Sequence, residues 1–179
     1  MKFYSTIQEV NLDTAIIEQA RKFANDVVTT IDYSDSNQTS LEKIRLDHFV
    51  SKLGEEAAAF VLSNYTSVIG PDYTIYEAKQ KNWEHDLLVN DTGLAVKTQT
   101  RSAAVKYTLS WTFQSGEKRK DIILQQPEAW VVFVECNDLS HYSCYVYPPF
   151  QMKELVLGEP KLPYLKKHKK VVYAATLPL

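Results

Sequence analysis

An acid and a lysine interrupt two short apolar runs in the middle of the chain. Asp86 lies near the start of the run 85–89, and Lys97 lies within the run 94–100. The turn-forming residues at 90–93 between them (Asn-Asp-Thr-Gly) predict a hairpin that pairs the two runs as antiparallel strands. Charged side chains rarely interrupt apolar strands unless they have partners. An acid and a lysine brought together in this way suggest metal-assisted cleavage of a phosphodiester.

That chemistry requires an attacking water, charge neutralisation at phosphorus and stabilisation of the leaving oxygen. Carboxylates that hold Mg²⁺ supply much of this, because small hard cations prefer oxygen ligands. A nearby lysine orients the water and offsets the charge that develops on the phosphate. Since side chains alternate along a strand, Ala95, Lys97 and Gln99 are expected on one face, and Val96 and Thr98 on the other.

Asp86, the hairpin and the run Val96-Lys97-Thr98-Gln99 together resemble the core of the PD-(D/E)xK, or restriction-endonuclease-like, nucleases, as found in small phage or bacterial members. The resemblance implies that Asp86 and the backbone carbonyl of Val96 bind Mg²⁺ or Mn²⁺. It also implies that Lys97 orients the water and stabilises the phosphate, and that Gln99 positions water or substrate.

The same superfamily places a glutamate on a helix before the first strand, after a small residue four positions earlier. The stretch 51–55 (Ser-Lys-Leu-Gly-Glu) fits this pattern, so Glu55 is the predicted helix acid and a further metal ligand. Glu56 is the rival catalytic acid, because it is expected nearer the apolar side of the helix that Leu53 and Phe60 define.

Ala95 departs from the family pattern, which has Glu or Asp two residues before the lysine. Asp72 is the best substitute as a metal ligand, and Glu77 and Glu84 are others. A second explanation is that the protein binds nucleic acid or protein without cutting. A third is that alanine is an inactivating substitution in the chain as given.

Two helices followed by a series of strands are predicted. Asp13 is expected to cap the first helix, and Thr39 or Ser40 the second, which runs to about Tyr65. After the Gly-Pro pair at 70–71, strands are predicted at 73–76, 85–89, 94–100, 130–136 and 142–147, an irregular or helical stretch at 151–165, and an edge strand at 171–174. We therefore expect an α/β (α+β) fold in which helices flank a central mixed sheet. The resemblance implies a restriction-endonuclease-like core over about residues 41–114.

The 179 residues suit one domain, with a helical part at 1–70 and a mainly sheet part at 71–179. The sequence has no apolar stretch of signal-peptide or membrane-span character. Its two cysteines, Cys136 and Cys144, are expected to be buried free thiols on a probable strand pair. These features predict a cytoplasmic protein.

The net charge of −2 is not that of a protein that coats nucleic acid, but the basic residues are clustered. Those near the predicted site are candidate phosphate contacts, namely Lys79, Lys81, Arg101, Lys118, Arg119 and Lys120. The predicted function is therefore a Mg²⁺-dependent DNA endonuclease. Many enzymes of this type dimerise, so the resemblance also implies that the protein could form a homodimer.

Overall fold

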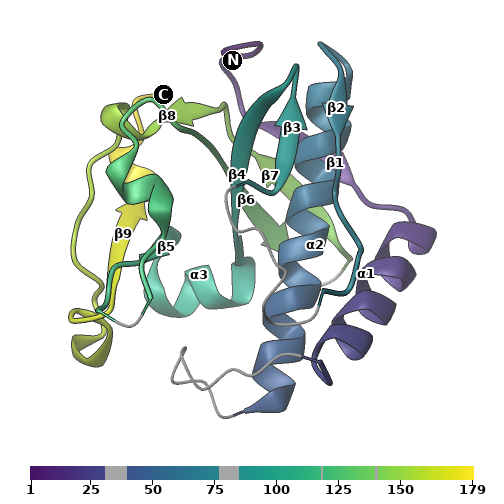
Figure 1. The fold of residues 1–179 in the computed structure, drawn as a ribbon, viewed down its shortest axis with the longest axis horizontal. Helices are drawn as coiled ribbons and strands as arrows, with labels where there is room; N and C mark the ends of the chain where they lie inside the picture. Colours follow the sequence, from purple (N-terminus) through teal and green to yellow (C-terminus); the bar gives the residue numbers. More distant parts are fainter. Residues whose placement is uncertain (31–39, 77–84, 118, 140) are drawn as a thin grey trace.

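The fold is mixed α+β, with one large sheet that carries helices on one face and a small sheet on the other (Figure 1). The computed structural model describes residues 1–30, 40–76, 85–117, 119–139 and 141–179. Over these ranges, the large sheet has seven strands and the small sheet has two. None of the helices in the described ranges is long and apolar enough to cross a membrane.

The two long helices begin where their capping residues predict. Helix α1 spans Thr14–Val27, and Asp13 Oδ1 accepts a hydrogen bond from Ile16 N at 2.8 Å. Helix α2 spans Leu41–Ser63, and Ser40 Oγ accepts from Lys43 N at 3.3 Å. Such side-chain bonds satisfy amides of the first turn that have no partner within the helix. Both predicted helices are confirmed.

The large sheet has the order β1-β7-β6-β4-β3-β2, and β8 (Phe150–Gln151) also pairs with β6. Its strands are β1 (Gln8–Asn11), β2 (Val68–Ile69), β3 (Leu87–Val89), β4 (Thr92–Thr100), β6 (Trp130–Asn137) and β7 (Ser143–Val146). Strands β4 and β6 are parallel, and the other pairs are antiparallel. The small sheet pairs β5 (Ser110–Gln114) with β9 (Lys169–Tyr173).

The predicted hairpin joins β3 to β4. Val89 pairs with Thr92, so Asn90 and Asp91 form a two-residue turn, with φ of 48° and 60°. Positive φ at both central residues is the geometry that matches the twist of paired strands, and Asn and Asp tolerate it well. The segment after β4 folds as helix α3 (Arg101–Tyr107) and leads through β5 to β6.

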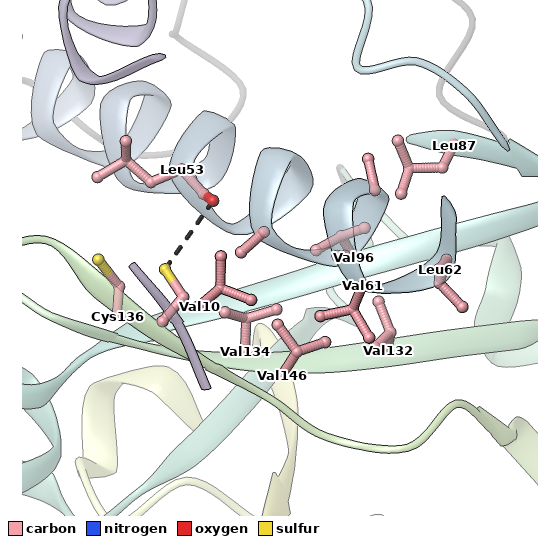
Figure 2. Packing of buried hydrophobic residues seen from close by; sticks show 14 of the residues in the cluster. Val10, Leu53, Val61, Leu62, Leu87, Val96, Val132, Val134, Cys136 and Val146 are labelled. Atoms are coloured by element: carbon pink, nitrogen blue, oxygen red, sulfur yellow. Dashed lines mark hydrogen bonds between the residues drawn. The ribbon is translucent and has the colours of Figure 1, made fainter. Parts of the chain in front are cut away.

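Strand β4 separates two hydrophobic clusters, as the predicted alternation requires. Val96 packs with Leu53 and Leu62 of α2 on one face (Figure 2), whereas Ala95 packs with Phe113 and Phe133 on the other. Further members of the first cluster are Cys136 and Cys144, which face each other on β6 and β7. Both cysteines are buried and free, as predicted, and Cys144 Sγ lies 3.9 Å from the carbonyl oxygen of Leu53 (Figure 2).

Three parts of the fold differ from the sequence-based expectation. Residues 73–76 form no strand, and the strand in this region is β2, a few residues earlier. Strands β1, β5 and β8 and helix α3 were not predicted. The predicted last strand exists as β9, but it pairs with β5 in the small sheet.

Candidate functional site

Asp86 lies just before β3, where its carboxylate continues the hydrogen bonding of the sheet. Its backbone N donates to the carbonyl oxygen of Leu94 at 3.0 Å, and its Oδ2 accepts from Val96 N at 2.7 Å. Strand β3 begins at Leu87, which pairs with Leu94. The Asp86 carboxylate therefore bonds to β4 just outside the region where the two strands pair. Among the described residues, Oδ2 is the only atom of this exposed carboxylate that accepts a hydrogen bond.

Glu55 is buried in α2, with only 4% of its surface exposed. Its Oε1 accepts from Ser51 Oγ at 3.1 Å, and its Oε2 accepts from Lys52 Nζ at 2.5 Å. Burial and the charge of Asp86 raise the pKa of Glu55 to about 7, and the opposing effects of Lys52 and Ser51 do not cancel this shift. The structure therefore brings Glu55 and Asp86 close enough for their charges to interact.

Lys52 is a buried residue of this region that the sequence analysis did not single out. Its Nζ also donates to the backbone carbonyl of Asp72 at 2.7 Å. It lies 4.9 Å from the ring centroid of Phe23 and 5.3 Å from that of Tyr73. Lys52 thus connects α2 to α1 and to the segment after β2. Its position three residues before Glu55 was the available signal, since this spacing places both side chains together on a helix.

The rival acids occupy other positions. The expectation that Glu56 lies nearer the apolar side is wrong, because Glu55 is the more buried of the two and Glu56 Oε1 accepts from Tyr73 Oη at 2.9 Å. Asp72 precedes residues 73–76, which form no strand, and its oxygens accept from Thr74 N at 2.8 Å and Tyr76 Oη at 2.6 Å. These bonds fold the segment back on itself, which accounts for the missing strand at 73–76. The other proposed substitutes, Glu77 and Glu84, lie outside the described residues.

Lys97 projects from the face of β4 opposite α2. Its Nζ donates to Asp121 Oδ2 at 2.9 Å and lies 5.0 Å from the ring centroid of Phe113. Asp121 comes just before the 3₁₀ helix η2 (Ile122–Gln125), and its Oδ2 also accepts from Gln114 N at 3.1 Å. The structure therefore pairs Lys97 with Asp121, an acid that the sequence analysis missed. The two residues are 24 positions apart, and no motif connects them.

The neighbours of Lys97 on the same face contribute to packing. Gln99 Oε1 accepts from Ser110 N at 2.8 Å, which fixes the start of β5 against β4. Ala95 is 8% exposed and belongs to the cluster that contains Phe113. The role of Gln99 in positioning water or substrate stays a prediction.

The candidate phosphate contacts are spread over several elements. Arg101 Nε donates to Glu135 Oε1 at 2.8 Å, Arg119 is half-buried, and Lys120 is exposed. Lys79, Lys81 and Lys118 lie outside the described residues. Lys169, the first residue of β9, was not among the predicted contacts. Burial lowers its pKa, and the charges that act on it include Asp47, Lys43, Asp121 and Lys97, so Lys169 lies near the Lys97–Asp121 pair.

The oxygen atoms around Asp86 are the hard ligands that Mg²⁺ prefers. They come from Asp86 itself, from the Val96 backbone beside it and from buried Glu55. Within the described ranges, no group of three or more His, Cys, Asp or Glu side chains is placed to hold a metal ion. The described side chains thus offer Asp86, with Glu55 near it and bonded to Ser51 and Lys52, and any further ligands would have to be backbone, water or substrate oxygens.

Comparison with known proteins does not assign the chain to a family. No family model, no curated protein and no solved structure matches it.

Proposed function

We propose that this protein is a Mg²⁺-dependent DNA endonuclease built on a restriction-endonuclease-like core. One observation carries the proposal. The Asp86 carboxylate is bonded to Val96 N at 2.7 Å, on the residue that precedes Lys97 in β4, and its charge acts on the buried acid Glu55. A carboxylate held in this way keeps an oxygen available for a cation, at the strand that also carries Lys97.

The order of the elements supports the same proposal. Helix α2 carries Glu55, β3 follows Asp86, β4 carries Lys97, and α3 then leads to β6, which is parallel to β4. This is the order of helix acid, strand acid and strand lysine on which the resemblance to PD-(D/E)xK nucleases rests. Fold resemblance alone does not establish an activity, so the argument depends on the geometry around Asp86.

In this proposal, Asp86 and the Val96 carbonyl hold the metal, with Glu55 close to them. Bound Mg²⁺ would lower the pKa of a bound water and offset charge on the phosphate. Lys97 would orient the attacking water and stabilise the charge of the transition state through its ammonium group. Arg101, Arg119, Lys120 and Lys169 are candidate contacts to neighbouring phosphates. Such contacts are local, because the chain as a whole carries a net charge of −2.

The test is cleavage of supercoiled plasmid DNA in Mg²⁺ by the intact protein. We expect nicked or linear product, none in the presence of EDTA, and a loss of at least about 100-fold in rate for Asp86→Asn. Asp91→Asn is the matched control, since Asp91 is an exposed acid in the nearby turn and Asn tolerates its positive φ. Equal cleavage by Asp86→Asn and the wild type would overturn the proposal.

A second candidate function is a nucleic-acid- or protein-binding module that keeps the nuclease-like core without cutting. Ala95 favours it, because the position two residues before Lys97 carries no acid and packs in an apolar cluster. Titration with Mn²⁺ separates the two candidates. An enzyme should bind Mn²⁺ in a way that Asp86→Asn weakens, whereas a pure binding module need not bind metal. Cleavage created or raised by Ala95→Glu would favour the enzyme.

A further inference from the structure

Two basic runs that are far apart in the sequence are brought together at one end of the small sheet. One run is 118–120, which follows β5, and the other is 166–170, which extends into β9. Ser115 contacts both runs, because it forms a bridge with Lys120 and its N donates to the carbonyl oxygen of His168 at 2.8 Å. We define the basic surface as the described members of the two runs: Arg119, Lys120, Lys166, Lys167, His168, Lys169 and Lys170.

We infer that the basic surface binds the phosphate backbone of duplex DNA, whatever the base sequence. The inference goes beyond the proposed function, since it involves neither Asp86 nor a metal ion. Contacts from lysine and arginine to phosphates hold a duplex in place but carry no sequence information of their own. The proposal therefore concerns the affinity for DNA and its dependence on salt.

Charge complementarity is the first argument for this partner. The runs 118–120 and 166–170 hold seven Lys and Arg residues and one His, with no acid among them. The whole chain carries −2, so without these seven positive charges the other 171 residues carry −9. A polyanion that approaches the protein is therefore repelled by most of the chain and attracted to the basic surface.

Most lysines of the basic surface have no acidic partner in the described parts of the chain. Lys166 pairs with Glu159 at 3.2 Å, whereas Lys120, Lys167 and Lys170 make no ion pair there. Outside the surface, six of the eight described lysines pair with an acid: Lys2, Lys22, Lys43, Lys52, Lys97 and Lys153. The basic surface thus keeps ammonium groups available for an anion that belongs to another molecule.

The positive charges of the basic surface also oppose one another. Burial lowers the pKa of Lys169, and the charges of Lys43 and Lys97 act in the same direction, against Asp47 and Asp121. A phosphate beside Lys169 would offset the excess of positive charge. Since only the folded chain presents the two runs together, duplex DNA should raise the melting temperature of the protein.

The basic surface continues toward Lys97. Lys169 is opposite Gln114 in the small sheet, and Gln114 N donates to Asp121 Oδ2 at 3.1 Å. The same Asp121 oxygen accepts from Lys97 Nζ at 2.9 Å. A DNA backbone on the basic surface would therefore lie on the side of β4 that carries Lys97, the residue expected to stabilise a phosphate.

An anionic membrane is the other partner that a cluster of lysines attracts, but membrane binding also needs apolar side chains that insert into the bilayer. Between positions 160 and 170, Tyr164 is the one large apolar or aromatic side chain that is exposed, at 70%. It lies in the 3₁₀ helix η4 (Pro163–Leu165), which is too short to form an amphipathic helix. A tyrosine beside lysines suits DNA instead, because its hydroxyl can donate to a phosphate.

The experiment measures binding of a fluorescein-labelled duplex of about 20 base pairs to the intact protein by fluorescence anisotropy, in EDTA so that no DNA is cleaved. Lys120→Glu combined with Lys167→Glu changes one exposed lysine in each run. We expect this variant to lose at least about tenfold in affinity, and the slope of log K against log salt concentration to fall by about two. Lys22→Glu combined with Lys153→Glu is the matched control, since both lysines are exposed, belong to neither run and give the same net charge. It should lose less than about threefold in affinity.

Thermal unfolding with and without the duplex completes the test. The midpoints without DNA show whether each variant is folded. The duplex should raise the melting temperature of the wild type and of the control, but not that of the variant changed at Lys120 and Lys167.

Equal affinity and equal salt slope in the Lys120–Lys167 variant and the control would overturn this inference. Cleavage that depends on Asp86 would in that case leave the proposed function standing. A wild type that binds phosphatidylserine vesicles but not the duplex would also overturn the inference and assign the basic surface to membranes. Duplex binding that depends on Lys120 and Lys167, in a protein that cleaves no DNA, would support this inference and overturn the proposed function.

Discussion

Two acid–lysine pairs lie on opposite sides of β4, and they differ mainly in burial. On the α2 side, Lys52 and Glu55 are 2.5 Å apart, with side chains 10% and 5% exposed. On the β5 side, Lys97 and Asp121 are 2.9 Å apart, with side chains 26% and 20% exposed. The same kind of ion pair is thus closed to water on one side of β4 and partly open to water on the other.

The buried pair is suited to hold the structure together. Lys52 also donates to the Asp72 carbonyl and lies near the rings of Phe23 and Tyr73, so it joins three segments. A buried ion that loses its partner has no water to replace it, and the loss is costly. The partly exposed pair can exchange its partners with water or substrate at little cost. The same substitution should therefore cost much more stability on the α2 side than on the β5 side.

The largest effect on stability is expected from Lys52→Met, which keeps much of the side-chain volume but removes the charge. At about pH 8, above the pKa of about 7 of Glu55 in the intact protein, the substitution removes the ammonium group that lowers this pKa, so the buried carboxylate must either take up a proton or stay charged without a partner. We expect the free energy of unfolding to fall by about 4 kcal/mol, as measured by urea denaturation. A loss below about 1 kcal/mol, the value for an exposed pair, would remove the distinction between the two sides.

The next effect tests how closely α2 is packed on β4. A Cβ atom at Gly54 would lie 1.8 Å from Thr98 Oγ1 and 2.9 Å from Thr98 Cβ, so Gly54→Ala forces the helix away from the strand. We expect a loss of about 3 kcal/mol in the free energy of unfolding. Adding Thr98→Ala should recover part of this loss, because it removes the clashing Oγ1 atom. No hydrogen bond is lost with it, since that hydroxyl has no partner among the described residues. Equal stability of Gly54→Ala and the wild type would show that α2 is not closely packed against β4 at this position.

A smaller effect on the free energy of unfolding is expected from a change of pH, measured in EDTA so that no metal ion binds. The pKa of Glu55 is raised from 4.5 to about 7, so its contribution to stability is fully present below pH 4.5 and is lost as the pH rises through 7. Between about pH 5 and pH 8 the contribution should fall by about 2 kcal/mol. Glu55→Gln should remove this slope. Glu56→Gln, one residue away and less buried, is the control and should keep the pH dependence. If the pH dependence survives Glu55→Gln, it belongs to another titrating group.

The smallest effect on stability is expected from Lys97→Met, the counterpart of Lys52→Met across the strand. Its ion pair with Asp121 is partly exposed, so water can solvate the remaining carboxylate. We expect the free energy of unfolding to change by less than about 1 kcal/mol in urea denaturation. A loss as large as that of Lys52→Met would make the Lys97–Asp121 pair a structural one.

The parts of the fold that the sequence predicted are those with local signals. Asp13 and Ser40 cap the two long helices, and the turn at Asn90 and Asp91 fixes the hairpin. Strand β1 could not be predicted in this way, because its four residues pair with β7, so that Glu9 meets Tyr145 136 positions away. The β5–β9 sheet depends on distant pairing in the same manner.

The candidate site was predictable to a similar extent. Alternation along β4 placed Ala95 and Lys97 on one face and Val96 on the other, and the two clusters agree with this. Burial of Lys52 and the approach of Asp121 to Lys97 depend on packing between separate segments. Neither a motif nor a periodicity in the sequence reports such packing, so Asp121 could not be identified as the partner of Lys97 from the sequence alone.

The measurement that tests the central claim most directly is Mg²⁺-dependent cleavage of supercoiled plasmid by Lys97→Met beside the wild type. The variant is expected to fold normally, because the Lys97–Asp121 pair is partly exposed, so a loss of cleavage would be a loss of chemistry. We predict no detectable product from Lys97→Met under conditions in which the wild type converts all of the plasmid. Cleavage at the wild-type rate would contradict the account, because Lys97 would then have no part in the reaction.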